Sequence, residues 1–282
     1  MKKHLLLLFT ALLPLVASAQ AKVEIDGIWY NLVSMAKVAE VTFKGDSYYS
    51  YYDEYSGSIT IPATVTYEGV TCSVKNIGDE AFRRCRSLTA ITIPEGVKSI
   101  GYAAFSGCES LTAINFPVGV TSIGDYAFSG CSSLTSITLP VGLTSIRWNA
   151  FRGCSSLTAI MLPKSVKSIG EEAFANCSEL TDVYCYAETV PSTGLSAFEG
   201  SYIEYATLHV PASALDSYRA TAPWSKFGNI VALTDEEMGV EQLTIDNARI
   251  TIYDLHGRRV ATPTKDGIYI VDGKKVMVKT GM

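Results

Sequence analysis

Histidine is scarce in this chain, which has three among 282 residues. His4 lies in an apolar leader, His209 in an expected strand and His256 in a turn near the C-terminus. Nucleophilic catalysis needs a base beside the attacking group. The chain also lacks an HExxH motif, a glycine-rich phosphate loop and calcium-loop spacing. The sequence therefore predicts a protein that is not an enzyme and carries no cofactor.

Basic residues show no excess. Lys and Arg number 23 against 28 Asp and Glu, which gives a formal net charge of −5. Binding to phosphate backbones needs clustered Lys and Arg, and attraction to anionic lipid needs a polybasic patch. Neither nucleic acid nor a membrane surface is therefore an expected partner.

Long apolar runs are missing apart from one at the start. Lys2 and Lys3 precede the apolar residues 5–16, and Ala17-Ser18-Ala19 follows. This order is typical of a secretory signal peptide. The run is also shorter than the roughly 20 residues that a membrane-spanning helix needs. We expect cleavage near Ala19, no membrane insertion, and a mature protein that is secreted or held at the cell surface.

Paired cysteine motifs are missing as well. The seven cysteines include no CxxC pair, and no histidine lies among them, so a zinc site is not expected. Five of them recur at a step of 23 residues, at Cys85, Cys108, Cys131, Cys154 and Cys177. Stacked equivalents lie about 4.8 Å apart, but their parallel Cβ vectors suit a disulfide poorly. Of the two interpretations, disulfides or buried free thiols, we favour thiols that act as small hydrophobes.

The same step governs other residue types. Phenylalanine recurs every 23 residues at Phe82, Phe105, Phe128, Phe151 and Phe174. Leucine does so at Leu88, Leu111, Leu134, Leu157 and Leu180, and proline at Pro94, Pro117, Pro140 and Pro163. A fixed period of this length is typical of stacked units, each of which needs its neighbours to bury its apolar face. We expect the phenylalanines to form an internal column.

Each repeat is predicted to contribute one strand to a parallel sheet. Ile91 and Ile93 alternate with threonine, the pattern of a strand with one buried face. Pro94 ends the strand because it has no N–H for the ladder. Gly96 follows in a turn that requires either a positive φ or close packing.

The motif C-x-x-L-x-x-I-x-[IFL]-P, followed by [GS]-[VL]-x-S-I-G-x-x-A-F-x-x-C, recurs from Cys85 to Cys177. It resembles the BspA-type bacterial leucine-rich repeat family, over about half of the chain. The resemblance implies a leucine-rich repeat right-handed solenoid, β-rich with little helix, in a secreted or surface protein. Members of this family are linked to adhesion and to host-protein binding.

The two ends of an array need caps because terminal units expose apolar faces and open edges. We expect a capping hairpin, with strands at 23–33 and 38–43, and Trp224 and Phe227 closing the other end after a short helix at 212–220. The tyrosine-rich segment 47–55 is either an adhesive loop or, as we favour, a connection packed on the cap. The expected organisation is a signal peptide at 1–19, the N-terminal cap and loop at 20–56, repeats at 57–198, a C-terminal cap at 199–233, and a linker with a small β tail at 234–282.

The tail predicts three short strands, at 250–260, 267–271 and 273–279, separated by glycine turns. Its I-Y-x-x-x-G-x-x-V and G-I-Y-I-V segments resemble the C-terminal sorting domains of the Por (type IX) secretion system. That resemblance implies export or surface attachment. The tail departs from the pattern because it lacks the first strands of a full domain and continues past Lys279. A β appendage without a sorting role is the alternative.

Candidate ligand contacts lie where the repeat leaves residues free. Outward strand positions are small, neutral and rich in hydroxyls, and leucine-rich repeat proteins generally bind on the concave sheet. The candidates there are Thr89, Thr92, Asn115, Thr138, Met161 and Tyr184. The alternative is that threonine only suits an exposed strand.

The fourth repeat departs from the others at a turn. It reads Ile-Arg-Trp-Asn-Ala-Phe where the others read Ile-Gly-x-x-Ala-Phe, and this places Arg147, Trp148 and Arg152 together. Exposed tryptophan and arginine are typical of binding hot spots. The alternative is that Trp148 only covers a neighbouring turn.

Three functions are compatible with these features. The first is a non-enzymatic interaction or adhesion module that binds an extracellular protein. The second is a surface protein that binds a glycan for nutrient capture, and the third is a purely structural surface protein.

Overall fold

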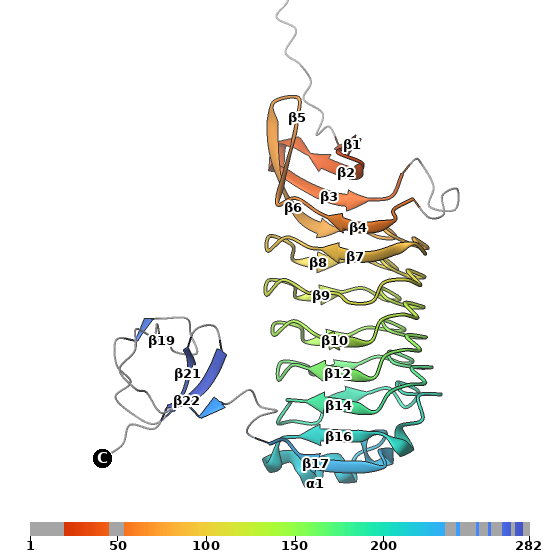
Figure 1. The fold of residues 1–282 in the computed structure, drawn as a ribbon, viewed down its shortest axis with the longest axis vertical. Coiled ribbons are helices and arrows are strands. Elements are labelled where there is room, and N and C mark those ends of the chain that lie inside the picture. The colour runs from red at the N-terminus through yellow and green to blue at the C-terminus, as the bar shows by residue number, and fades with distance from the viewer. Residues whose placement is uncertain are drawn as a thin grey trace, which may run out of the picture.

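The computed structural model describes residues 20–44 and 54–234, together with short strands between residues 241 and 278. From β4 to β17 the chain winds into stacked coils that form a solenoid (Figure 1). The longer strands are β4 (Gly57–Thr60), β7 (Leu88–Thr92), β10 (Ser136–Thr138), β12 (Ala159–Leu162), β14 (Asp182–Cys185), β16 (Thr207–Val210) and β17 (Asn229–Ala232). Parallel pairing joins β4 to β7 and, in a second sheet, β10 through β17 in chain order. The predicted solenoid with parallel sheets and little helix is confirmed.

Most coils carry a second, two-residue strand that the sequence did not predict. These strands are β8 (Ser99–Ile100), β9 (Ser122–Ile123), β11 (Ser145–Ile146), β13 (Ser168–Ile169) and β15 (Ser192–Thr193). Their ladder is interrupted between β9 and β11. Arg147, which follows β11, occupies the position that Gly101 and Gly124 hold in other coils. A Cβ on Gly124 would lie 2.6 Å from the carbonyl carbon of Gly101, so a side chain here does not fit the regular coil spacing.

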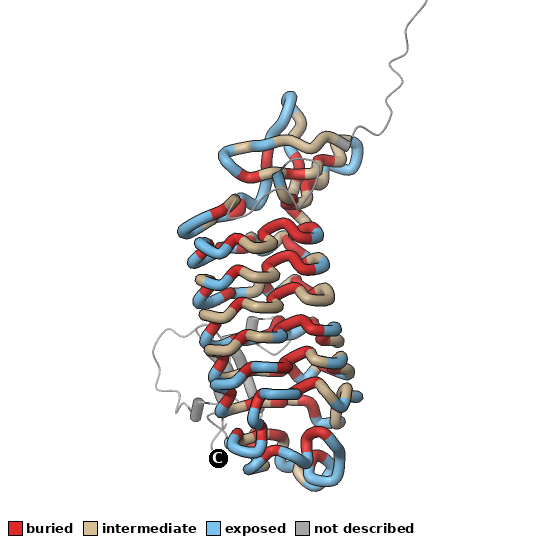
Figure 2. Tube along the Cα trace, turned by 90° about the vertical axis from the view of Figure 1, so that its right-hand side faces the viewer, coloured by how far each residue is buried: buried red, intermediate tan, exposed pale blue. Residues whose placement is uncertain are grey.

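The core is a column of stacked phenylalanine rings. Ring centroids are 5.1 Å apart between Phe82 and Phe105 and 5.6 Å apart between Phe174 and Phe198, with neighbouring planes nearly parallel. Figure 2 shows buried residues at the same places in successive coils. The predicted internal column is confirmed.

The cysteines form a second internal ladder. All seven are buried and free, so the favoured interpretation is confirmed. Four of them donate, at 3.1–3.4 Å, to the carbonyl of a phenylalanine in the preceding coil, and these donors are Cys108, Cys131, Cys154 and Cys177.

Every repeat turn contains residues in the left-handed region. One position has φ between 48° and 58°, at Glu80, Ala103, Tyr126, Asn149 and Glu172, and a second holds Arg84, Gly107, Gly130, Gly153, Asn176 and Gly200. Gly96 is required by close packing instead, because its Cβ would lie 3.0 Å from the Val74 carbonyl oxygen.

The N-terminal cap differs from the predicted hairpin. It has three antiparallel strands, β1 (Gln20–Ile25), β2 (Ile28–Val33) and β3 (Val38–Thr42), because Asp26 and Gly27 both have positive φ and turn the chain within the expected first strand. β3 pairs in parallel with β6 (Val70–Ile77), and β5 (Thr64–Tyr67) forms a hairpin with β6. The buried Tyr55 ring lies 4.8 Å from Phe82 and closes the column. Residues 47–53 of the tyrosine-rich segment, and the predicted signal peptide, lie outside the described residues.

At the other end, the strand β16 leads into a 3₁₀ turn (Ala212–Ala214), the helix α1 (Leu215–Ala220) and a second 3₁₀ turn (Trp224–Lys226). Trp224 and Phe227 are buried, and their rings contact Phe198 at 5.5 and 5.4 Å. The prediction that these two residues close the core is confirmed. Leu233, where the array was expected to end, is also buried.

The described part of the tail holds more strands than the three predicted. β18 (Glu241–Gln242), β19 (Ile252–Tyr253), β20 (Arg259–Val260), β21 (Gly267–Val271) and β22 (Lys274–Val278) form one sheet in the order β18-β22-β21-β19-β20. The expected strand at 250–260 is two strands, since Ile252 pairs antiparallel with Val260. Among the described residues, no helix has the length and apolar character needed to span a membrane.

Candidate interaction surfaces

Five of the six strand candidates form two columns on the outward side of the longer strands. Thr92 pairs with Asn115 through an isolated bridge. Farther along, Thr138 pairs with Met161, and Met161 pairs with Tyr184. Their side chains are exposed or half-buried, as the alternation of each strand requires.

Thr89 does not join them. It lies in a separate column in which threonine hydroxyls bond the preceding coil. Thr112 Oγ1 donates to the Thr89 carbonyl at 3.4 Å, and Thr158 and Thr181 repeat the contact at 3.0 and 3.1 Å. In this column threonine has a structural role, because its hydroxyl already donates a hydrogen bond to the preceding coil.

A small hollow separates the two columns. It measures about 200 Å³ and is lined by Ala113, Ile114, Asn115, Phe116, Ser136 and Thr138. Phe116 stands where other repeats have isoleucine or leucine, and its ring packs edge-on against Phe128 at 5.6 Å. The strand ladder is interrupted beside this larger ring, between Asn115 and β10. The polar lining of the hollow can bind one small hydrogen-bonding group.

His209 extends the second column beyond the predicted residues. Its ring stacks on Tyr184 at 4.3 Å, and its Nε2 lies 3.1 Å from Asp182 Oδ1. Tyr184 and His209 are 25 residues apart, so a search at a step of 23 residues does not pair them.

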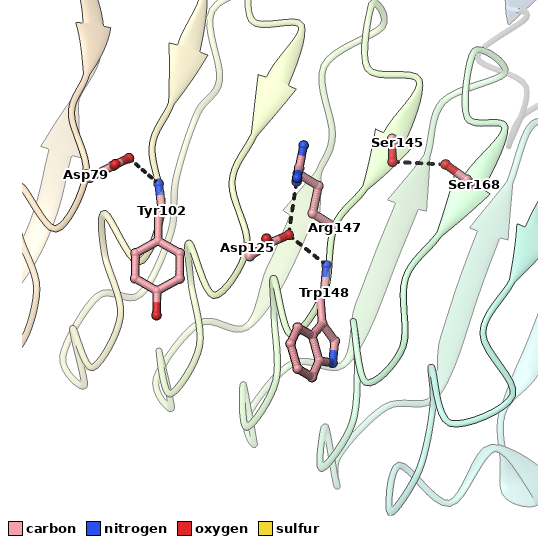
Figure 3. Close-up of polar contacts among 7 residues, drawn as sticks. All are labelled: Asp79, Tyr102, Asp125, Ser145, Arg147, Trp148 and Ser168. Carbon is pink, nitrogen blue, oxygen red and sulfur yellow. Dashed lines mark hydrogen bonds and ion pairs between the residues drawn. The ribbon is translucent and has the colours of Figure 1, made fainter.

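The turns after the short strands carry a different surface. Tyr102, Tyr126 and Trp148 lie on successive coils with their ring centroids 5.8 Å apart at each step. We call these three residues the aromatic stripe. Tyr102 and Trp148 are 46% and 51% exposed, and both point away from the coils in Figure 3. Such a row of exposed rings presents apolar area at a low cost in side-chain entropy.

Trp148 is held in place on both of its sides. Its backbone N donates to Asp125 Oδ1 at 3.2 Å (Figure 3). In the amide orientation that satisfies both neighbours, the buried Asn149 accepts a hydrogen bond from the indole Nε1 at 2.6 Å and donates to Glu172 at 3.3 Å. Trp148 therefore packs on the neighbouring turn, as the alternative interpretation expects, and half of its surface still faces solvent. A binding role for Trp148 stays a prediction.

The two predicted arginines flank Trp148 as ion pairs rather than as free positive charges. Arg147 Nε lies 3.0 Å from Asp125 Oδ1, and Arg152 Nε lies 3.1 Å from Glu172 Oε2. Both pairs are largely solvent-exposed, where an ion pair contributes about 0–1 kcal/mol. The edges of the aromatic stripe are therefore polar but close to neutral. The nine predicted residues thus do not form one surface, because six lie on the side of the longer strands and three lie in the turn after β11.

Asp79 and Glu171 occupy the same repeat position as Asp125, and their carboxylates also accept hydrogen bonds from the next coil. Asp79 Oδ1 accepts from the Tyr102 backbone N at 2.7 Å (Figure 3). Glu171 accepts from the hydroxyl and the backbone N of Ser196, and these bonds lower the pKa of Glu171 below its usual value. Asp79 and Asp125 thus hold the turns that present Tyr102 and Trp148.

The ionisable groups of the core are held neutral. Burial raises the pKa of the Cys131 and Cys154 thiols well above the ordinary value, and raises that of Cys177 to about 12. A thiol is a nucleophile or a metal ligand only as the thiolate. Within residues 20–44 and 54–234, no three His, Cys, Asp or Glu side chains are grouped so that they can hold a metal ion.

The repeated strand, turn and phenylalanine column define a leucine-rich repeat solenoid. The profile of the BspA type Leucine rich repeat region matches six copies over residues 46–119 and 98–218, which is more than half of the chain. The chain therefore belongs to the BspA-type leucine-rich repeat family.

One solved structure supports the fold, and a second one is similar in sequence over most of its length. A leucine-rich repeat protein of T. pallidum is 29% identical, with 67% of this chain and 81% of that chain covered and a TM-score of 0.55. A leucine-rich repeat protein of Bacteroides ovatus is 19% identical, with 79% and 82% covered and a TM-score of 0.34. No curated protein matches the chain.

Proposed function

We propose that the chain is a secreted or cell-surface, non-enzymatic module that binds an extracellular protein, as in adhesion. The observation that carries the proposal is the aromatic stripe. Tyr102 and Trp148 are exposed, and Trp148 is held by Asp125 and Asn149 and flanked by two arginine ion pairs. Preorganised tryptophan and tyrosine with arginine nearby is the composition of a protein-binding hot spot.

The non-enzymatic part of the proposal is supported by the state of the thiols. The repeat cysteines are buried, and Cys131, Cys154 and Cys177 have raised pKa values and each donate to a backbone carbonyl. They serve the interior of the stack rather than a reaction.

Secretion is supported by the order of features in residues 1–19. Two lysines, an apolar run and Ala17-Ser18-Ala19 form the parts of a signal peptide. The β tail, with its resemblance to a Por sorting domain, is proposed to act after export in surface attachment.

Glycan binding is the second candidate, and the outward strand columns favour it. The stacked Tyr184 and His209 offer a flat ring, and Asn115 and Thr138 offer hydrogen-bonding groups beside the hollow. Sugars are held by such a combination of ring faces and polar groups.

A paired screen tests the proposal. The chain from residue 20 to 282 is presented both to purified extracellular matrix proteins and to a glycan array. The proposal expects a protein ligand whose affinity falls at least about tenfold in Trp148→Ala, the scale of a hot spot. Tyr67→Ala, which removes an exposed ring from the hairpin of β5 and β6, is the matched control and keeps full affinity. Glycan binding that Trp148→Ala leaves intact would favour the second candidate.

A further inference from the structure

A second hollow lies where the last repeat departs from the period. Ser201 stands at the cysteine position, and the segment between Ser201 and β16 is one residue longer than the segment between Cys177 and β14. This segment forms a 3₁₀ turn (Ile203–Tyr205) beside the preceding coil. The resulting hollow measures about 400 Å³ and is lined by Ser178, Glu179, Leu180, Thr181, Tyr202 and Tyr205. We call it the tyrosine hollow.

Packing does not explain its two tyrosines. Tyr202 is 56% exposed and Tyr205 is 84% exposed. Tyr202 also has a φ of 49°, a left-handed conformation that is unfavourable for a large side chain. An aromatic residue in a strained position with little burial contributes little to the fold. Such residues are concentrated at binding sites.

Most hydrogen-bond donors of the hollow other than the two phenol groups are already bonded, so acceptors predominate in its lining. The hydroxyls of Ser178 and Thr181 already donate to carbonyls of the preceding coil, at 3.4 and 3.1 Å. The backbone N–H groups of Glu179, Leu180 and Thr181 are likewise bonded to carbonyls, at 3.0–3.2 Å. The remaining groups are hydroxyl lone pairs and the Glu179 carboxylate, which forms no ion pair among the described residues.

The ligand that fits this lining supplies donors and a positive charge and can stack on a ring. No Lys or Arg lines the hollow, and Glu204 adds a second acid on the same 3₁₀ turn. A guanidinium is donor-only, planar and always charged, and it stacks on aromatic faces. A neutral sugar uses the acceptors but gains nothing from the two acids.

We propose that the tyrosine hollow binds an arginine side chain exposed on a partner protein. The guanidinium stacks on Tyr202 or Tyr205 and donates to the Glu179 carboxylate, while Ser178 and Thr181 accept further hydrogen bonds. This proposal rests on the proposed function in that it requires a protein partner. It does not depend on the aromatic stripe, because the residues of the tyrosine hollow belong to other coils.

The test uses a blocked Gly-Arg-Gly peptide as the probe. It is titrated into the chain of residues 20–282 carrying ¹³C-labelled tyrosine, and the ring signals of Tyr202 and Tyr205 are assigned with Tyr→Phe variants. We expect these two signals to shift with saturation while the signal of Tyr67 stays in place. A Gly-citrulline-Gly peptide keeps the shape but loses the charge, and should bind about tenfold more weakly, as should the arginine peptide to Glu179→Gln.

The possible outcomes separate this proposal from the aromatic stripe. Trp148→Ala should leave the arginine response unchanged, so the site can be present even if the stripe binds nothing. Equal responses to the arginine and citrulline peptides, or no shift of either tyrosine signal, would overturn the proposal. So would a response to methyl glucoside or methyl galactoside in place of the peptide.

Discussion

Removing one ring from the middle of the phenylalanine column is the sharpest perturbation of this fold. Phe128 is fully buried and contacts three rings: Phe105 at 5.1 Å, Phe151 at 5.3 Å and Phe116 at 5.6 Å. Truncating a buried phenylalanine costs about 3–5 kcal/mol. Because each coil contacts only its neighbours, the loss weakens both interfaces of this coil. We expect Phe128→Ala to split urea unfolding into two transitions.

Phe151→Ala is the matched control for this prediction. Phe151 is equally buried but has two ring neighbours, Phe128 and Phe174. An aromatic pair is worth about 0.5–1.5 kcal/mol beyond its buried area, so Phe128→Ala should be the more destabilising variant by about that amount. The measurement is urea unfolding followed by circular dichroism and by hydrogen exchange. Equal unfolding free energies for the two variants, or a single transition in Phe128→Ala, would refute this reasoning.

Three further outcomes are expected. Gly124→Ala should lower the free energy of unfolding by about 1–3 kcal/mol in urea titrations, because its Cβ would meet the Gly101 backbone at 2.6 Å; a neutral effect would contradict the packing. Tyr55→Phe should cost about 1–3 kcal/mol in the same assay, because the Tyr55 hydroxyl accepts from the Trp29 backbone N and donates to a carbonyl of β3, and an unchanged midpoint would count against those bonds. Stability should fall as pH rises from 9.0 towards about 12, since in this window the unfolded chain releases the Cys177 proton and the folded chain keeps it; Cys177→Ala should make that part of the pH profile less steep, and an unchanged slope would contradict the assignment.

The features that follow the period of 23 residues could be predicted from the sequence. The phenylalanine column, the buried thiols and the outward positions of Thr92 and Thr138 all derive from comparing one repeat with the next. A periodic core is predictable because each unit must bury the same face against the same neighbour.

Features that break the period could not be found in this way. Tyr126 lies 24 residues after Tyr102, so the aromatic stripe does not appear in an alignment at a step of 23. Tyr202 and Tyr205 lie in an irregular segment that no other repeat resembles. The turn at Asp26 and Gly27 did carry a local signal, because Asp-Gly favours a tight hairpin, and that signal was missed within a longer apolar run.

The most direct test of the central claim is the hydrogen-exchange footprint of a captured protein ligand on the chain of residues 20–282. The aromatic stripe predicts protection in the turns after β8, β9 and β11, around Tyr102, Tyr126 and Trp148. Protection confined to β10, β12 and β14, with those turns exchanging as in the free protein, would contradict the claim and place binding on the outward strand face.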